Sequence, residues 1–98
     1  MIGEAFERVG IDSIGPIKET KNGNKFIIVA INFLTKIVEL GALTGKTAEN
    51  VGDFIYAKII FNHGCPNVIL SDNGKEFDNK MVEALCAKLR INKKFTSP

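Results

Sequence analysis

Two aspartates are the residues of this chain whose type and position point most directly to chemistry. Asp72 ends the apolar run 68–71 and stands immediately before the turn-forming pair Asn73-Gly74. Asp12 lies in the alternating stretch 6–14, where a strand is expected and where aspartate is depleted. Two carboxylates held side by side repel each other unless a cation neutralises them. Such a pair suits Mg²⁺, which prefers oxygen ligands and often takes only one or two carboxylates from a protein.

Each aspartate also has an ordinary structural interpretation. An Asp before Asn-Gly is common in turns, because its side chain accepts a hydrogen bond from the backbone two residues on. An isolated Asp at a strand end more often forms a cap or a turn than binds a metal. It is therefore the combination of Asp12 and Asp72, in the strand order described next, that favours a shared site.

Three β-rich stretches come before any helical pattern. They cover residues 6–14, 25–31 and 37–40, and turn signals separate them at Gly15-Pro16, around Asn22-Gly23 and at 34–36. The second stretch is apolar at nearly every position, so we expect it to be buried on both faces. Strands joined by turns this short form an antiparallel meander.

The apolar period then changes to that of a helix. Thr47 suits an N-cap, and apolar residues recur every three or four positions, which predicts a helix over 47–61. A fourth strand at 68–71, a second helix at about 79–90 capped by Asp78 or Asn79, and a short fifth strand at 92–96 complete the order βββαβαβ. This order allows the first and fourth strands to lie parallel and adjacent. Asp12 and Asp72 would then leave the sheet at the same carboxyl-terminal edge, where open α/β sheets build their sites.

Length and composition limit the classes of protein to which the chain can belong. Its 98 residues make one domain at most, near the lower limit for a self-sufficient core. With 45% hydrophobic and 24% charged residues, the composition is that of an ordinary globular protein. No apolar stretch approaches the roughly 20 residues that cross a membrane, and no secretory leader pattern opens the chain. We therefore expect an intracellular protein.

Cysteines and basic residues are less specific signals. Cys65 and Cys86 lack the spacing of a zinc site, so we interpret them as reduced thiols packed as small apolar side chains. The net charge is only +2, but basic residues gather at 18–25 and 88–94. Such clusters either contact phosphates or form a solvated surface.

Several segments share the pattern of one known class of protein. They are Arg8-Val9-Gly10-Ile11-Asp12, Gly15-Pro16, Gly23-Asn24-Lys25-Phe26-Ile27, Thr35-Lys36 and, as the most specific, Ser71-Asp72-Asn73-Gly74-Lys75-Glu76-Phe77. Together they resemble the catalytic core of retroviral and long-terminal-repeat retrotransposon integrases, closest to the Ty3/Gypsy type. The resemblance runs from about residue 6 to residue 98, so the chain is interpreted as a single partial core domain over 1–98.

The resemblance implies a ribonuclease-H-like fold and a metal-dependent reaction on DNA. Asp12 and Asp72 correspond to the first two acids of the family's Asp, Asp, Glu triad, which holds two divalent ions, Mg²⁺ or Mn²⁺. In enzymes of this family, water attacks first to process the DNA end of the element, and the freed 3′-hydroxyl then attacks target DNA. DNA is thus the expected partner, with Lys36, Asn73 and Lys75 as candidate contacts. Lys36 and Lys75 are expected near the edge of the site, where each either touches a DNA phosphate or is simply solvated. The resemblance also makes the helix 47–61 a candidate homodimer surface, and a functional protein would be nuclear.

The chain departs from the family at the third acid. That glutamate is expected about 35 residues after the second aspartate, whereas 26 residues follow Asp72. Glu76 is interpreted as ending the turn or capping the next helix, and Glu83 as lying on the solvent side, so neither is expected to replace it. The family's C-terminal helices are also missing. The chain by itself is therefore predicted to be inactive.

Two further polar residues have structural interpretations. Asn32 stands where related sequences usually carry Asp, and we interpret it either as sequence drift or as a turn former. His63 precedes Gly64 at the end of the first predicted helix, where a basic side chain is favourable. Neither residue is expected to bind a metal.

Three functions remain open from the sequence. The first is a piece of an integrase core that is inactive alone, and the second is a non-enzymatic DNA- or protein-binding domain derived from an integrase. The third is another ribonuclease-H-like nuclease that completes its site differently. A phosphoacceptor receiver domain also carries Asp at a strand end, but its strands alternate with helices from the start, whereas three strands come first here.

Overall fold

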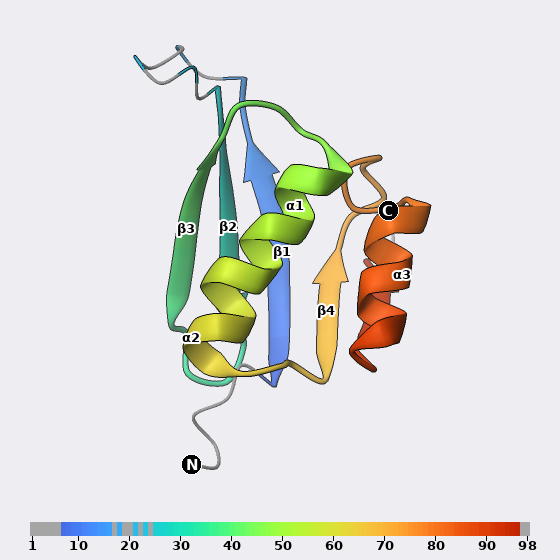
Figure 1. Ribbon diagram of the computed structural model, residues 1–98. Helices are drawn as coiled ribbons and strands as arrows, with labels where there is room; N and C mark the ends of the chain where they lie inside the picture. Colours follow the sequence, from blue (N-terminus) through green and yellow to red (C-terminus); the bar gives the residue numbers. More distant parts are fainter. Residues whose placement is uncertain (1–6, 17, 19–20, 22, 24, 97–98) are drawn as a thin grey trace.

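The computed structural model describes residues 7–16, 18, 21, 23 and 25–96 (Figure 1). Its elements are β1 (Arg8–Ile14), β2 (Phe26–Asn32), β3 (Val38–Leu43), α1 (Ala48–Phe54), η1 (Ile55–Ile60), α2 (Phe61–His63), β4 (Val68–Ser71), α3 (Lys80–Lys88) and β5 (Asn92–Phe95). The predictions that concern Phe6, Asn22 and Ser97-Pro98 lie outside the described residues.

The five strands form one mixed sheet in the order β3-β2-β1-β4-β5. β1, β2 and β3 pair antiparallel as a meander, while β4 lies parallel to β1 on its other side and β5 lies parallel to β4. The order βββαβαβ and the adjacency of the first and fourth strands are therefore confirmed. Strands 1 and 4 come together because a helix crosses over the sheet between β3 and β4 (Figure 1).

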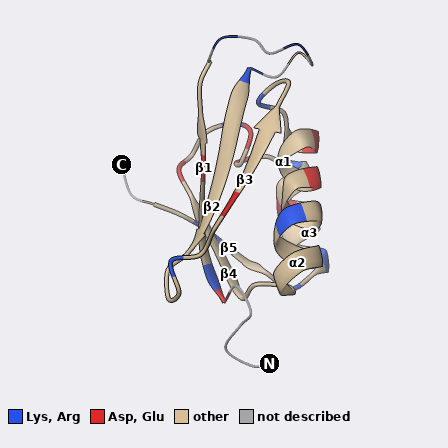
Figure 2. Ribbon diagram, turned by 90° about the vertical axis from the view of Figure 1, so that its left-hand side faces the viewer, with Lys and Arg blue, Asp and Glu red and all other residues tan. Residues whose placement is uncertain are grey.

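Both helical segments pack on the same face of the sheet, as Figure 2 shows. The core between the two layers contains Val9, Ile11, Ile28, Ala30 and Ile69 from the strands and Val51, Phe54, Ile55, Ile59, Val82 and Cys86 from the helices. Along β2 only every second residue is buried, because successive side chains point to opposite faces of a sheet. The expectation that β2 is buried on both faces is thus wrong: no element of the described chain covers its second face.

The first helical segment is continuous from 48 to 63 but is not a regular α-helix. Thr47 is its N-cap, as predicted, and accepts a hydrogen bond from the Asn50 amide at 3.1 Å. Its middle part, η1, is π-helical, a rare geometry that the sequence pattern did not predict. Apolar residues spaced by four rotate about 40° past one another on a helix of 3.6 residues per turn. The wider turn offsets this drift and keeps Val51, Ile55 and Ile59 against the sheet, each at most 1% exposed.

α3 is shorter than the predicted helix over 79–90. Asn79 rather than Asp78 is the N-cap, and its side chain accepts from the Val82 amide at 2.9 Å. At the other end the Ile91 amide donates to the Cys86 carbonyl and the Arg90 amide to the Ala87 carbonyl. These two bonds form a Schellman motif, which ends the helix and puts Arg90 at a φ of 59°.

The β2–β3 turn lies at the end of the sheet where β1 and β4 begin, opposite to the end where these two strands finish. Asn32 organises this turn, as predicted: its Oδ1 accepts from the Leu34 amide at 3.0 Å and its carbonyl from the Lys36 amide at 2.7 Å. At the end of α2, His63 Nε2 lies 2.7 Å from Glu39 Oε2 of β3. His63 is thus in the last helical turn, as expected, and also joins the helix to the edge of the sheet. Within the described chain, no helix combines the length and the apolar character needed to span a bilayer.

Candidate functional site

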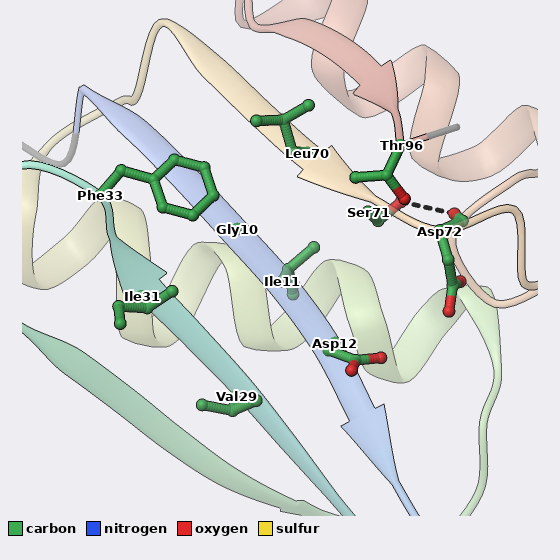
Figure 3. A pocket seen from close by; sticks show the side chains of 10 residues that line it. All are labelled: Gly10, Ile11, Asp12, Val29, Ile31, Phe33, Leu70, Ser71, Asp72 and Thr96. Carbon is green, nitrogen blue, oxygen red and sulfur yellow. Dashed lines mark hydrogen bonds between the residues drawn. The ribbon is translucent and has the colours of Figure 1, made fainter. Parts of the chain in front are cut away.

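The strand register brings Asp12 and Asp72 to the same edge of the sheet. β1 and β4 are paired at Arg8 with Val68, Val9 with Ile69 and Gly10 with Leu70. Each aspartate follows two residues after the last of these pairs, so the two occupy equivalent positions on neighbouring parallel strands. Both line one pocket of about 290 Å³, and Figure 3 shows Asp12 on β1, two residues before that strand ends, and Asp72 just after the end of β4.

One oxygen of each carboxylate is engaged with the backbone. Asp12 Oδ1 accepts from the Ser13 amide at 2.8 Å, and Asp72 Oδ1 accepts from the Gly74 amide at 2.8 Å. The bond of Asp72 is the turn interaction expected before Asn-Gly. Asp72 therefore forms the predicted turn and also shares its position with Asp12. Both side chains are exposed. The second oxygen of each makes no hydrogen bond with a residue that the structure describes.

This donor set fits a hard divalent cation. Two free carboxylate oxygens at an open edge leave the rest of a coordination shell to water or phosphate oxygens, an arrangement that Mg²⁺ tolerates. Within the described residues, no three side chains of His, Cys, Asp or Glu are grouped so as to hold a metal ion. The metal-ligand and catalytic roles of Asp12 and Asp72 stay predictions.

The remaining wall of the pocket is the uncovered face of the sheet. Gly10, Ile31, Phe33 and Leu70 line it (Figure 3). Phe33 lies across β1 because Gly10 has no side chain: a Cβ there would be 2.7 Å from Phe33 Cζ. The site is therefore polar at the strand ends and apolar along the strands.

Ser71 and Lys93 lie behind Asp72, an arrangement that sequence reasoning missed. Ser71 is 2% exposed, donates to the Asp72 carbonyl at 2.9 Å and accepts from Lys93 Nζ at 2.6 Å. Burial lowers the pKa of Lys93, while attraction to Cys86 in its thiolate form and to the carboxylates of Asp78 and Asp72 opposes that shift. Lys93 Nζ also lies 3.9 Å from the centre of the Phe95 ring. The sequence showed Lys93 only as part of a basic cluster, because its partner Ser71 is brought near by the β4–β5 pairing.

Glu76 is placed differently from its sequence interpretation. Its carboxylate does not cap α3, where Asn79 is the cap. Instead Glu76 Oε2 accepts from Ser13 Oγ at 2.8 Å, across 63 residues of sequence. The expectation that Glu76 caps the next helix is therefore wrong. The 72–77 turn brings its carboxylate to β1 instead, which a local pattern cannot show.

The three candidate DNA contacts do not lie together. Asn73 and Lys75 are exposed in the turn that follows Asp72, so they border the site. Lys36 lies in the β2–β3 turn at the opposite end of the sheet, because β2 runs antiparallel to β1. The expectation that Lys36 lies near the site edge is wrong, and contact of any of the three with DNA stays a prediction.

Comparison with known proteins finds relatives among the polyproteins of retroviruses and related transposons. The chain is 34% identical over 87 residues, 89% of its length, to the Retrovirus-related Pol polyprotein from transposon 412 of Drosophila melanogaster. It is 35% identical over 76 residues to the Gag-Pol polyprotein of Gibbon ape leukemia virus. The matched segments are 7% and 4% of those two polyproteins. No protein-family model matches the chain.

The fold has a counterpart among solved structures. The crystal structure of the catalytic core domain of BIV integrase superposes with a TM-score of 0.77 and 25% identity, over 96% of this chain and 57% of that one. A transposon protein and a retroviral protein match at similar identity, so membership of the Ty3/Gypsy type in particular stays a prediction. Sequence and fold agree: the chain belongs with the Pol polyproteins of retroviruses and related transposons, as a ribonuclease-H-like domain similar to an integrase catalytic core.

Proposed function

We propose that this domain contributes two carboxylates, Asp12 and Asp72, to a divalent-metal site that acts on DNA phosphodiesters during integration. The observation that carries the proposal is their equivalent position on parallel neighbouring strands, where one oxygen of each makes no hydrogen bond with a described residue. The chain spans only a small part of its polyprotein relatives and about half of the BIV core. The reaction is therefore proposed for the longer protein, and the chain alone is proposed to bind the metal weakly.

The chain's own residues hold and orient the site. Asp12 and Asp72 present their free oxygens at the strand ends, and the turn after Asp72 presents Asn73 and Lys75 to a DNA phosphate. Ser71 and Lys93 fix the backbone of Asp72 from behind. Bound Mg²⁺ or Mn²⁺ would stabilise the charge on the attacking and leaving oxygens of an in-line displacement at phosphorus.

The proposal extends to assembly and location. DNA is the partner, and a homodimer through the face of α1, η1 and α2 is the candidate assembly. The nucleus follows as the proposed location because the substrate is DNA.

Paramagnetic Mn²⁺ tests the metal site in the isolated chain. In amide NMR spectra, Mn²⁺ should broaden the signals of Ser13, Asn73 and Gly74 first, because these amides adjoin the two carboxylates. Asp12→Asn and Asp72→Asn should each abolish this selectivity. Asp53→Asn, which removes an exposed carboxylate on α1, is the matched control and should leave it unchanged. Broadening that starts at α1, or that survives both site variants, would overturn the proposed site.

A strand-transfer assay tests the part assigned to the longer protein. With Mg²⁺ or Mn²⁺ and labelled donor DNA, the 98-residue chain should give no joined product, because its described residues supply only two carboxylates to the site. Joined product that disappears in Asp72→Asn would show that this chain completes the site by itself.

A further inference from the structure

We propose that Glu76 is a positioning residue, which accepts a hydrogen bond from Ser13 and thereby fixes Asp12 and Asp72 relative to each other. This inference rests on the proposed function, because it concerns the same two carboxylates. It assigns to Glu76 a role through its neighbours and not as a metal ligand.

The backbone ladder between β1 and β4 stops short of the two aspartates. Its last pair is Gly10 with Leu70, and β4 itself ends at Ser71. Beyond that point the end of β1 and the turn after β4 need another connection if the carboxylates are to keep a fixed separation. The hydrogen bond from Ser13 Oγ to Glu76 Oε2, at 2.8 Å, lies in this region and joins the two segments.

The bond connects a residue next to Asp12 with one in the turn that follows Asp72. Ser13 follows Asp12 directly, and its amide also donates to Asp12 Oδ1. On the other side, a Cβ at Gly74 would lie 2.6 Å from Glu76 Oε1 and 3.0 Å from Asp72 Oδ1. The carboxylates of Glu76 and Asp72 therefore meet around the position where Gly74 lacks a side chain. Ser13 and Glu76 are both half-buried, which shields their bond from competing water.

Glu76 is itself held firmly enough to act as an anchor. Its carbonyl accepts from Asn79 Nδ2 at 3.0 Å. The next residue, Phe77, is 1% exposed in the core, and its amide donates to the Gly74 carbonyl at 2.9 Å. With its backbone tied to the N-cap of α3 and to the core, Glu76 can transmit a fixed position to Ser13. Residues that orient metal ligands in this way typically change metal affinity about 10- to 100-fold when replaced.

Four variants separate positioning from charge and from direct ligation. Ser13→Ala and Glu76→Ala should each raise the Mn²⁺ concentration that half-broadens the Gly74 amide signal by about tenfold. The double variant should be no weaker than either single one, because both remove the same bond. Glu76→Gln keeps an acceptor oxygen for Ser13 and should stay close to wild type. Asp53→Asn again serves as the control for loss of a carboxylate.

The pattern among these variants decides the question. If Glu76 acted as a ligand or by its charge alone, Glu76→Gln would weaken Mn²⁺ binding as much as Glu76→Ala, and Ser13→Ala would have no effect. That result would overturn the positioning role. If all four variants bound Mn²⁺ as tightly as the wild-type protein, the positioning role would be overturned as well.

A metal-free measurement keeps this inference distinct from the proposed function. Water-exchange NMR reports the protection of the Ser13 and Gly74 amides, which donate to Asp12 and Asp72. Both amides should exchange several-fold faster in Ser13→Ala and Glu76→Ala, and at the wild-type rate in Glu76→Gln. Unchanged exchange in the two alanine variants refutes the role of Glu76, whereas absent Mn²⁺ broadening in the wild type refutes only the metal site.

Discussion

Single residues of the 71–77 motif perform more than one task. Asp72 forms the turn expected before Asn-Gly and also lines the shared pocket, and among the described residues nothing hydrogen-bonds to its second oxygen. Gly74 provides the space in which the carboxylates of Asp72 and Glu76 approach each other. A motif that looks like ordinary turn chemistry can therefore also be the site, because the turn uses only one of the two carboxylate oxygens.

The two cysteines differ in their exposure to solvent. Cys86 is 1% exposed in the core, and burial raises its pKa, with Lys93 opposing the shift. Cys65 is exposed, so the prediction of a buried thiol is right for Cys86 and wrong for Cys65. Gly64 and Cys65 follow the end of α2, where the chain leaves the helical layer before β4 begins.

Thiol reactivity should follow this difference. A disulfide reagent should modify Cys65 within the native protein and Cys86 only as fast as the domain opens, because the thiolate is the reactive form and its burial is unfavourable. Cys65→Ser should remove the fast phase alone. The raised pKa of Cys86 also means that its contribution to stability is present at neutral pH and is lost as the pH rises above the ordinary thiol value. Two thiols that react equally fast in the folded protein would contradict the buried position of Cys86.

Among the elements, α3 shows how local signals set the ends of a helix. The Asn79 cap could be read from the sequence to within one residue, because Asn and Asp are both good N-caps. The C-terminal end could not, because Arg90 and Lys88 both favour a helix end by charge. The Schellman bonds end the helix at Lys88, where burial of Ile91 and Cys86 requires the chain to turn back to the sheet.

Arg90 occupies a backbone conformation that favours glycine. Its φ of 59° costs an L-residue roughly 1–2 kcal/mol. Glycine would avoid this cost, but part of the gain would be offset because glycine loses more backbone freedom on folding. Arg90→Gly should therefore raise the free energy of unfolding by about 0.5–1 kcal/mol, measured by urea denaturation. Arg90→Ala, which removes the charge but keeps the Cβ, is the control and should give no gain. Destabilisation by Arg90→Gly beyond that of Arg90→Ala would argue against the left-handed position.

Across the part of the molecule that the structure describes, two surfaces carry several exposed apolar side chains. One is the uncovered sheet face next to the site, and the other is the outer side of the first helical segment. There Tyr56 is 46% and Phe61 86% exposed, and both line a shallow pocket. Exposed apolar patches of this kind commonly mark interaction surfaces.

The proposed homodimer should depend on this helical surface. Sedimentation should show a concentration-dependent dimer that Phe61→Glu converts to a monomer, because a charge would then be buried without a partner. Met81→Glu, at a 53% exposed position on α3, is the control and should still dimerise. A wild-type chain that stays monomeric up to its solubility limit would contradict the proposed homodimer.

The sequence by itself determined the order of the elements, the Thr47 cap, the Asn32 turn and the choice of Asp12 and Asp72 as candidate site residues. Each of these depends on a local pattern of side-chain type and spacing. Only the tertiary structure decided which residues meet across the fold. It joined Ser13 to Glu76 and His63 to Glu39, placed Lys93 behind Ser71, and moved Lys36 to the opposite end of the sheet. These contacts depend on strand register and on the path of the turns. They are set by the burial of the whole core, so no local pattern contains them.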